Sequence, residues 1–139
     1  MKTRKRIVLA DDLGSVLNTV AKLLEGSYEI VSMAPDGRMA LEAILGLEPD
    51  LAVLDISMPV MSGIEVVREL RKRGNTTKIV FLTVHEDPDI LATCLAAGGL
   101  GYVVKMLMET DLIPAVNEAL AGRKFVSRFP SQLDEVNGK

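Results

Sequence analysis

The strongest constraint on the fold is a fivefold alternation of short apolar runs with segments whose apolar residues recur at helical spacing. The apolar runs cover residues 7–10, 28–33, 51–54, 79–82 and 102–104. The helical patterns that follow them cover residues 13–25, 36–45, 62–73, 87–97 and 110–121. Strands that alternate with helices predict a parallel sheet with helices on both faces and right-handed crossovers. We therefore predict a doubly wound α/β fold built from five βα units.

Several helix boundaries are marked by residues that suit helix ends. Asp36 can cap the second helix, and Ser62 with Glu65 forms the pattern of a capping box at the start of the third. Asp87 followed by Pro88 is typical of a helix start, because proline fits the first helical position. These signals agree with the apolar periodicity.

Composition and charge exclude some functions. The 139 residues suffice for one domain, and the formal net charge is −3. Aromatic residues make up only 4% and tryptophan is absent, so this chain by itself is a poor candidate for binding nucleic acid. The single cysteine, Cys94, cannot form an internal disulfide, which suits a reducing compartment. No apolar run approaches the ~18 residues that span a membrane, so we expect a cytoplasmic protein without a membrane partner.

The regular pattern ends at Gly122. Residues 123–139 contain proline, serine, asparagine and glycine and show neither helical nor strand periodicity. We therefore predict a single domain over residues 1–122 and a linker or tail over residues 123–139.

Polar residues follow four of the five predicted strands at the point where each strand ends. Asp11 and Asp12 follow the first strand, Asp55 the third, Thr83 the fourth and Lys105 the fifth. In open α/β sheets the carboxyl ends of the strands meet at one edge, where ligands bind. An aspartate after a strand is often only a helix cap, but five polar groups at one edge favour a functional site.

Three carboxylates at this edge need a compensating cation. Two unit charges about 4 Å apart repel by roughly 4 kcal/mol at an effective dielectric constant near 20. A hard divalent cation with oxygen ligands relieves the repulsion, and Mg²⁺ suits a site that also receives a phosphate. A carboxylate nucleophile, Mg²⁺, a lysine and a threonine form a set suited to phosphoryl transfer.

The same residues resemble the receiver domain of two-component response regulators over residues 5–122. The resemblance lies in Asp11-Asp12, in residues 55–63 (DISMPVMSG), in Thr83 and in residues 101–105 (GYVVK). It implies a flavodoxin-like (βα)5 fold with a five-stranded sheet in the order 2-1-3-4-5. It also implies a signalling domain, not an enzyme, that accepts a phosphoryl group from a sensor histidine kinase.

The resemblance also implies a role for each site residue. Asp55 is the phosphoacceptor. Mg²⁺ is bound directly by Asp12 and Asp55, through water by Asp11, and by the backbone carbonyl of Ser57. Thr83 and Lys105 contact the phosphoryl group, and Tyr102 is the switch aromatic that turns inward as Thr83 moves toward the phosphate.

Three positions near the site vary among receivers and are expected to tune it. Ser57 and His85 are placed to affect how water reaches the phosphate, although an exposed loop histidine without a role is an equally good interpretation of His85. Val84 is larger than the residue that many receivers have after the threonine, so we expect it to restrict access for phosphodonors.

Two other functions remain as alternatives. A small Mg²⁺-dependent phosphatase of the haloacid-dehalogenase type would use a similar set, but it needs a second acid two residues after the nucleophile, where Ser57 stands. A stand-alone receiver that acts only through protein contacts is the other alternative.

The output is expected to lie outside this sequence. Residues 82–87 and 119–127 resemble regulators with a LuxR-type helix-turn-helix output. This predicts a receiver cut from a longer transcription regulator, with DNA contacted only through an output domain that is absent here. We expect a homodimer through the face of the fourth helix, fifth strand and fifth helix.

Overall fold

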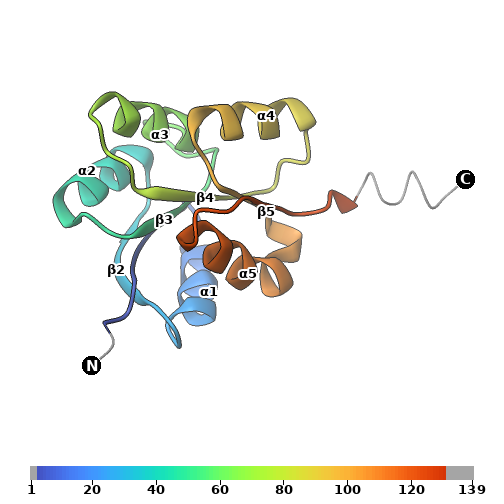
Figure 1. The fold of residues 1–139 in the computed structure, drawn as a ribbon, viewed down its shortest axis with the longest axis horizontal. Coiled ribbons are helices and arrows are strands. Elements are labelled where there is room, and N and C mark those ends of the chain that lie inside the picture. The colour runs from blue at the N-terminus through green and yellow to red at the C-terminus, as the bar shows by residue number, and fades with distance from the viewer. Residues whose placement is uncertain (1–2, 131–139) are drawn as a thin grey trace, which may run out of the picture.

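The computed structural model describes residues 3–130 and shows one parallel sheet between two layers of helices (Figure 1). The strand order is β2-β1-β3-β4-β5-β6. The strands are β1 (Arg6–Ala10), β2 (Glu29–Ala34), β3 (Leu51–Leu54), β4 (Lys78–Thr83), β5 (Gly101–Val104) and β6 (Phe125–Val126). The helices are α1 (Gly14–Leu24), α2 (Gly37–Leu47), α3 (Gly63–Lys72), α4 (Pro88–Ala97), the 3₁₀ helix η1 (Lys105–Leu107) and α5 (Met108–Leu120). The doubly wound α/β fold and the 2-1-3-4-5 order of the first five strands are confirmed.

The side chains of the strands alternate between two hydrophobic cores. Val8, Ala52 and Phe81 belong to the core under α2, α3 and α4. Ile7 and Val53 belong to the core under α1 and α5. Figure 1 shows the same division, with α2, α3 and α4 above the sheet and α1 and α5 below it. The central strands are therefore buried on both faces, as expected of a parallel sheet covered by helices.

The predicted helix caps are present. The Asp36 carboxylate accepts a hydrogen bond from the Met39 amide at 2.8 Å. The Ser62 hydroxyl accepts one from the Glu65 amide, and the Glu65 carboxylate accepts one from the Ser62 amide, which completes the capping box. These contacts satisfy amides that the helices themselves leave unpaired.

The sheet has a sixth strand, so the prediction of five strands was incomplete. Strand β6 lies in the segment predicted as linker or tail and pairs in parallel with β5. The chain turns at Gly122, where φ is +80°, and returns along the edge of the sheet. A strand of two residues is too short to show a periodic pattern, so it could not be predicted from residue spacing. Residues 131–139 of the predicted tail lie outside the described residues.

The last helix begins earlier than predicted. Helix α5 starts at Met108, and Pro114 lies inside it. The sequence pattern had placed the start at Thr110 or Asp111 because proline is best tolerated in the first turn. Met108 packs against the core under α1 and α5, which accounts for the additional residues.

Among residues 3–130, no helix combines the length and the apolar composition needed to cross a membrane.

Gly63 allows the start of α3 to approach the loop after β3 very closely. Its amide donates to the Ile56 carbonyl at 2.8 Å, and a Cβ at this position would lie 2.2 Å from the Asp55 carbonyl oxygen. We expect Gly63→Ala to lower the free energy of unfolding by about 1–3 kcal/mol, the usual range for overpacking. Chemical denaturation measures this change.

The matched control is Gly46→Ala in α2, where a Cβ would have no heavy atom within 4 Å. We expect this variant to gain about 0.5–1 kcal/mol, because alanine suits a helix better than glycine. Equal stability changes in the two variants would contradict the close approach at Gly63.

Candidate functional site

The sheet brings the predicted site residues to one edge. The Asp11 amide donates to the Ala34 carbonyl at 3.1 Å, and the Asp55 amide donates to the Ala10 carbonyl at 2.9 Å. These bonds continue the parallel pairing of β1 with β2 and β3 beyond the strand ends. The backbone of both aspartates is therefore fixed by the sheet, and their side chains stand at its carboxyl edge.

The three aspartates form an acidic cluster. Asp11, Asp12 and Asp55 each offer a carboxylate oxygen, and these oxygens all lie within 4.8 Å of one another. Asp11 and Asp55 are buried, whereas Asp12 is exposed. The cluster is therefore held rigidly at its inner side and open to solvent at its outer side.

Lys105 supplies positive charge to the two buried carboxylates. Its Nζ lies 2.7 Å from Asp11 Oδ2 and 3.3 Å from Asp55 Oδ2. Burial by itself would lower the pKa of Lys105, but the contacts with Asp11 and Asp55 outweigh it, and the pKa is raised. The lysine therefore stays protonated between the two acids.

Asp55 is electrostatically strained in its ionised form. Burial raises the pKa of its carboxyl group, and the negative charge of Asp11 raises it further. Lys105 and the Ile56 amide oppose these effects without cancelling them. One lysine is therefore insufficient to neutralise the acidic cluster.

The residues fit a divalent cation. Asp11 Oδ2 is buried and, although it lies at ion-pair distance from Lys105, it accepts no hydrogen bond of normal geometry from the described chain. Carboxylate oxygens are the ligands that Mg²⁺ prefers, and an exposed member such as Asp12 leaves room for water ligands. The donor set and the excess negative charge both support the predicted Mg²⁺ site.

His85 contacts three of the predicted site residues, namely Thr83, Tyr102 and Ser57. Its amide donates to Thr83 Oγ1 at 3.2 Å, and its carbonyl accepts a hydrogen bond from the Tyr102 hydroxyl at 2.8 Å. Its ring Nε2 lies 2.9 Å from Ser57 Oγ, at hydrogen-bond distance. The sequence leaves the role of His85 open, because the contacts with Thr83 and Tyr102 use its backbone amide and carbonyl. Residue type does not reveal such backbone contacts.

Tyr102 points inward and is fully buried. Burial raises the pKa of its hydroxyl, and the negative charge of nearby acidic groups adds to the effect. Val84, in contrast, is 65% exposed. Its side chain is accessible to a phosphodonor that approaches from solvent. The restriction of phosphodonor access by Val84 stays a prediction.

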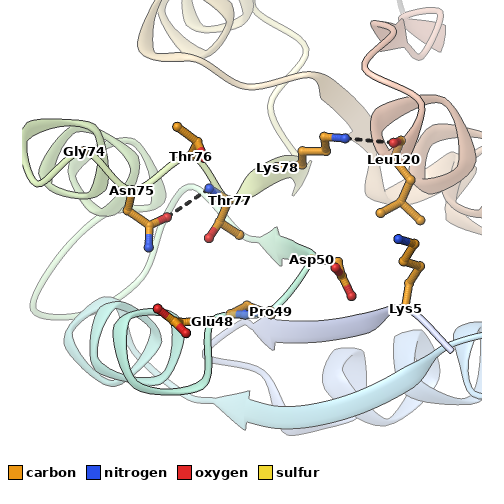
Figure 2. A pocket seen from close by; sticks show the side chains of 10 residues that line it. All are labelled: Lys5, Glu48, Pro49, Asp50, Gly74, Asn75, Thr76, Thr77, Lys78 and Leu120. Atoms are coloured by element: carbon orange, nitrogen blue, oxygen red, sulfur yellow. Dashed lines mark hydrogen bonds between the residues drawn. The ribbon is translucent and has the colours of Figure 1, made fainter. Parts of the chain in front are cut away.

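A polar pocket of about 460 Å³ lies at the opposite edge of the sheet (Figure 2). Lys78 Nζ donates to the Leu120 carbonyl at 2.8 Å there, and the Thr77 amide donates to Asn75 Oδ1 at 2.9 Å. None of the predicted site residues lines the pocket. It is therefore separate from the acidic cluster.

The sequence matches a known protein family. Residues 7–117 match the response regulator receiver domain family. The chain belongs to this family, whose members are signalling domains.

The chain is similar to transcriptional regulatory proteins. It is 36% identical to YvfU of Bacillus subtilis (strain 168) over 124 residues, which cover 88% of this chain and 62% of YvfU. It is 33% identical to the transcriptional regulatory protein NarL of Mycobacterium tuberculosis (strain H37Rv) over 136 residues, which cover 96% of this chain and 62% of that protein. The chain thus spans less than two thirds of the length of these relatives.

Solved structures show the same fold. The signal receiver domain of NarL from Mycobacterium tuberculosis matches with a TM-score of 0.84 and 32% identity, over 88% of this chain and 100% of that one. A LuxR-family two-component response regulator from Aurantimonas sp. SI85-9A1 matches with a TM-score of 0.84 and 29% identity, over 98% of this chain and 97% of that one.

The raised pKa of Asp55 predicts a pH-dependent effect of its removal. Because the pKa of Asp55 in the folded protein lies above its ordinary value of 3.8, the folded state binds more protons between these two pKa values, and stability falls as pH rises through that range. The cost of the ionised carboxylate is fully present above the folded pKa. We therefore expect Asp55→Asn to raise the free energy of unfolding at pH 7, with a gain that disappears below pH 3.8.

Urea denaturation across pH, with a chelator present, measures this difference. Glu42→Gln is the control, because it removes an exposed carboxylate of α2 that does not belong to the acidic cluster. A lower stability of Asp55→Asn at pH 7 would mean that Lys105 stabilises the ionised aspartate by more than burial and Asp11 destabilise it.

Proposed function

We propose that the domain is a phosphorylation-controlled switch in which Asp55 accepts a phosphoryl group from a sensor histidine kinase. The observation that supports this most directly is the acidic cluster itself. A buried aspartate stands beside a second buried carboxylate, an exposed carboxylate and a protonated lysine, at the edge of the sheet where ligands bind. Membership of the receiver family supports the same role.

The proposed Mg²⁺ site uses the residues of this cluster. Asp12 and Asp55 would bind the ion directly, Asp11 would act through a water molecule, and the backbone carbonyl of Ser57 would be a further ligand. When bound, the ion supplies positive charge that neutralises the oxygens of the incoming phosphoryl group.

In the proposed reaction, a carboxylate oxygen of Asp55 attacks the phosphorus of a phosphohistidine on the kinase. The O–P bond forms as the N–P bond breaks, and the imidazole leaves with the electron pair and takes up a proton from solvent. Lys105 presents its charge to the phosphoryl oxygens. The Thr83 oxygen already accepts a bond from the His85 amide, so its proton can be donated to a phosphoryl oxygen.

Movement of Thr83 toward the phosphate would be transmitted through His85 to Tyr102. The amide and the carbonyl of His85 contact these two residues, so a shift of one changes the bonding of the other. This change would alter the face formed by α4, β5 and α5, through which a homodimer or an output domain is controlled.

The output we propose is transcription regulation in a longer protein. The similarity to transcriptional regulatory proteins supports a DNA-binding output domain outside this sequence. We place the reaction in the cytoplasm, in keeping with the single reduced cysteine Cys94. A receiver that acts alone through protein contacts would use the same phosphorylation chemistry.

Phosphotransfer from a panel of labelled sensor kinases tests the proposed reaction. We expect one label per chain, bound through a bond that hydroxylamine cleaves. Its incorporation should require Mg²⁺ and should fail when EDTA is present from the start. Asp55→Asn should reduce incorporation to background. Lys105→Met should slow it by on the order of 100-fold, the usual effect of removing a group that stabilises a charged transition state.

Asp50→Asn is the matched control, because Asp50 lies at the opposite edge and its side chain accepts a bond from the Arg6 amide that asparagine can also accept. Label on Asp55→Asn at the level of the unaltered protein would refute the assignment of Asp55. Multiple turnovers of a phosphomonoester would instead indicate a phosphatase.

The contact between Ser57 and His85 predicts how long the phosphate persists. It joins the loops after β3 and β4 beside Asp55, where water must approach. We expect Ser57→Ala and His85→Ala each to speed loss of the phosphate about fivefold, since a hydrogen bond of ~1 kcal/mol corresponds to this factor in rate. The decay of labelled protein after removal of the donor measures the rate.

The double variant should decay no faster than either single variant, because both changes remove the same contact. Additive effects of the two changes on the decay rate would show that Ser57 and His85 act separately.

A further inference from the structure

The chain after α5 is bonded to the strand that carries the switch tyrosine. Residues 125–130 form the docked segment, which returns along the free edge of β5 (Figure 1). The Phe125 amide donates to the Leu100 carbonyl at 3.0 Å, and the Ser127 amide donates to the Tyr102 carbonyl at 2.8 Å. The position of the docked segment is therefore tied to the backbone of Tyr102.

The Ser127 hydroxyl fixes the docked segment to two further elements. The side chain is buried, and its Oγ donates to Asp111 Oδ2 in the first turns of α5 at 2.6 Å. The same oxygen accepts a hydrogen bond from the Val104 amide at 3.2 Å. Val104 directly precedes Lys105, so this contact lies one residue from the phosphoacceptor site.

Phe129 covers the ring of Tyr102. The ring centroids lie 5.9 Å apart with an interplanar angle of 47°. Phe129 is only 7% exposed and belongs to the core under α2, α3 and α4, as does Tyr102. The Tyr102 side chain is thus held at both ends, with its hydroxyl on the His85 carbonyl and its ring against Phe129.

An outward turn of Tyr102 would break both contacts. The ring would leave Phe129, and both aromatic side chains would lose burial, which is unfavourable. Docking of residues 125–130 therefore favours the inward position of Tyr102. The proposed phosphorylation of Asp55 favours the same position through Thr83 and His85.

We infer that the docked segment and the phosphoryl group on Asp55 are coupled through Tyr102, so that each stabilises the other. This inference rests on the proposed function. Two events that select the same state of one side chain must strengthen each other equally, by thermodynamic linkage. Phosphorylation would thus hold residues 125–130 against β5, and its loss would loosen that attachment.

Amide hydrogen exchange of the complete chain, with and without Mg²⁺ and beryllofluoride, tests the coupling. We expect the Phe125 and Ser127 amides to exchange at least about fivefold more slowly with beryllofluoride, the lower end of usual allosteric coupling. Phe129→Ala should exchange faster at both amides and lose this difference. Arg128→Ala, which changes an exposed neighbour, should behave like the unaltered protein.

A second variant keeps the test valid if Phe129→Ala does not fold. Ser127→Ala removes the hydroxyl contacts and leaves the Phe129 ring in place, so it should weaken the beryllofluoride effect on the Phe125 amide in the same direction. Linkage also requires that, at steady state with acetyl phosphate, a smaller fraction of either variant than of the unaltered protein is phosphorylated on Asp55.

The outcomes separate the two proposals. Beryllofluoride bound at Asp55, seen by fluorine NMR, with unchanged or faster exchange at Phe125 and Ser127 would overturn the coupling and leave the proposed function intact. No beryllofluoride signal in the unaltered protein at millimolar Mg²⁺ would overturn both.

Discussion

The site depends on two buried carboxylates that share one lysine. Asp11 and Asp55 are both removed from solvent, and Lys105 is the cation that lies between them. The sheet enforces this arrangement. The amide of Asp11 donates to β2 and that of Asp55 to β1, and Lys105 directly follows the end of β5. The repulsion that remains between the carboxylates favours a cation at the acidic cluster. Lys105 adds a positive group of the kind that suits a phosphate.

The arrangement of strands and the strand-end residues could be predicted from the sequence, because both depend on local patterns. Apolar runs identified the first five strands, and residue type together with position at a strand end identified Asp11, Asp55 and Lys105. Helix caps such as Asp36 were equally visible, since a cap is formed by residues three positions apart. The placement of these three charged groups close together followed from the rule that parallel strands end at one edge.

What the sequence could not reveal depends on contacts between distant residues. The contacts of His85 with Thr83 and Tyr102 involve its backbone groups, which every residue possesses. The position of β6 is stabilised by the contacts of Ser127 and Phe129, whose partners lie in α5 and β5 and share no periodic pattern with them. The sequence alone therefore predicts a linker here. The contacts that stabilise the segment join residues far apart in the chain.

Strand β6 also changes what another molecule can recognise on this side of the domain. An uncovered edge strand exposes a row of amides and carbonyls that can pair with a strand of any other chain. Here two residues, Phe125 and Val126, occupy the edge of β5 and offer too short a ladder to extend the sheet. A molecule that approaches this side therefore meets side chains such as the partly exposed Val126. Recognition there depends on the identity of the exposed side chains, whereas backbone pairing would accept a strand of almost any sequence.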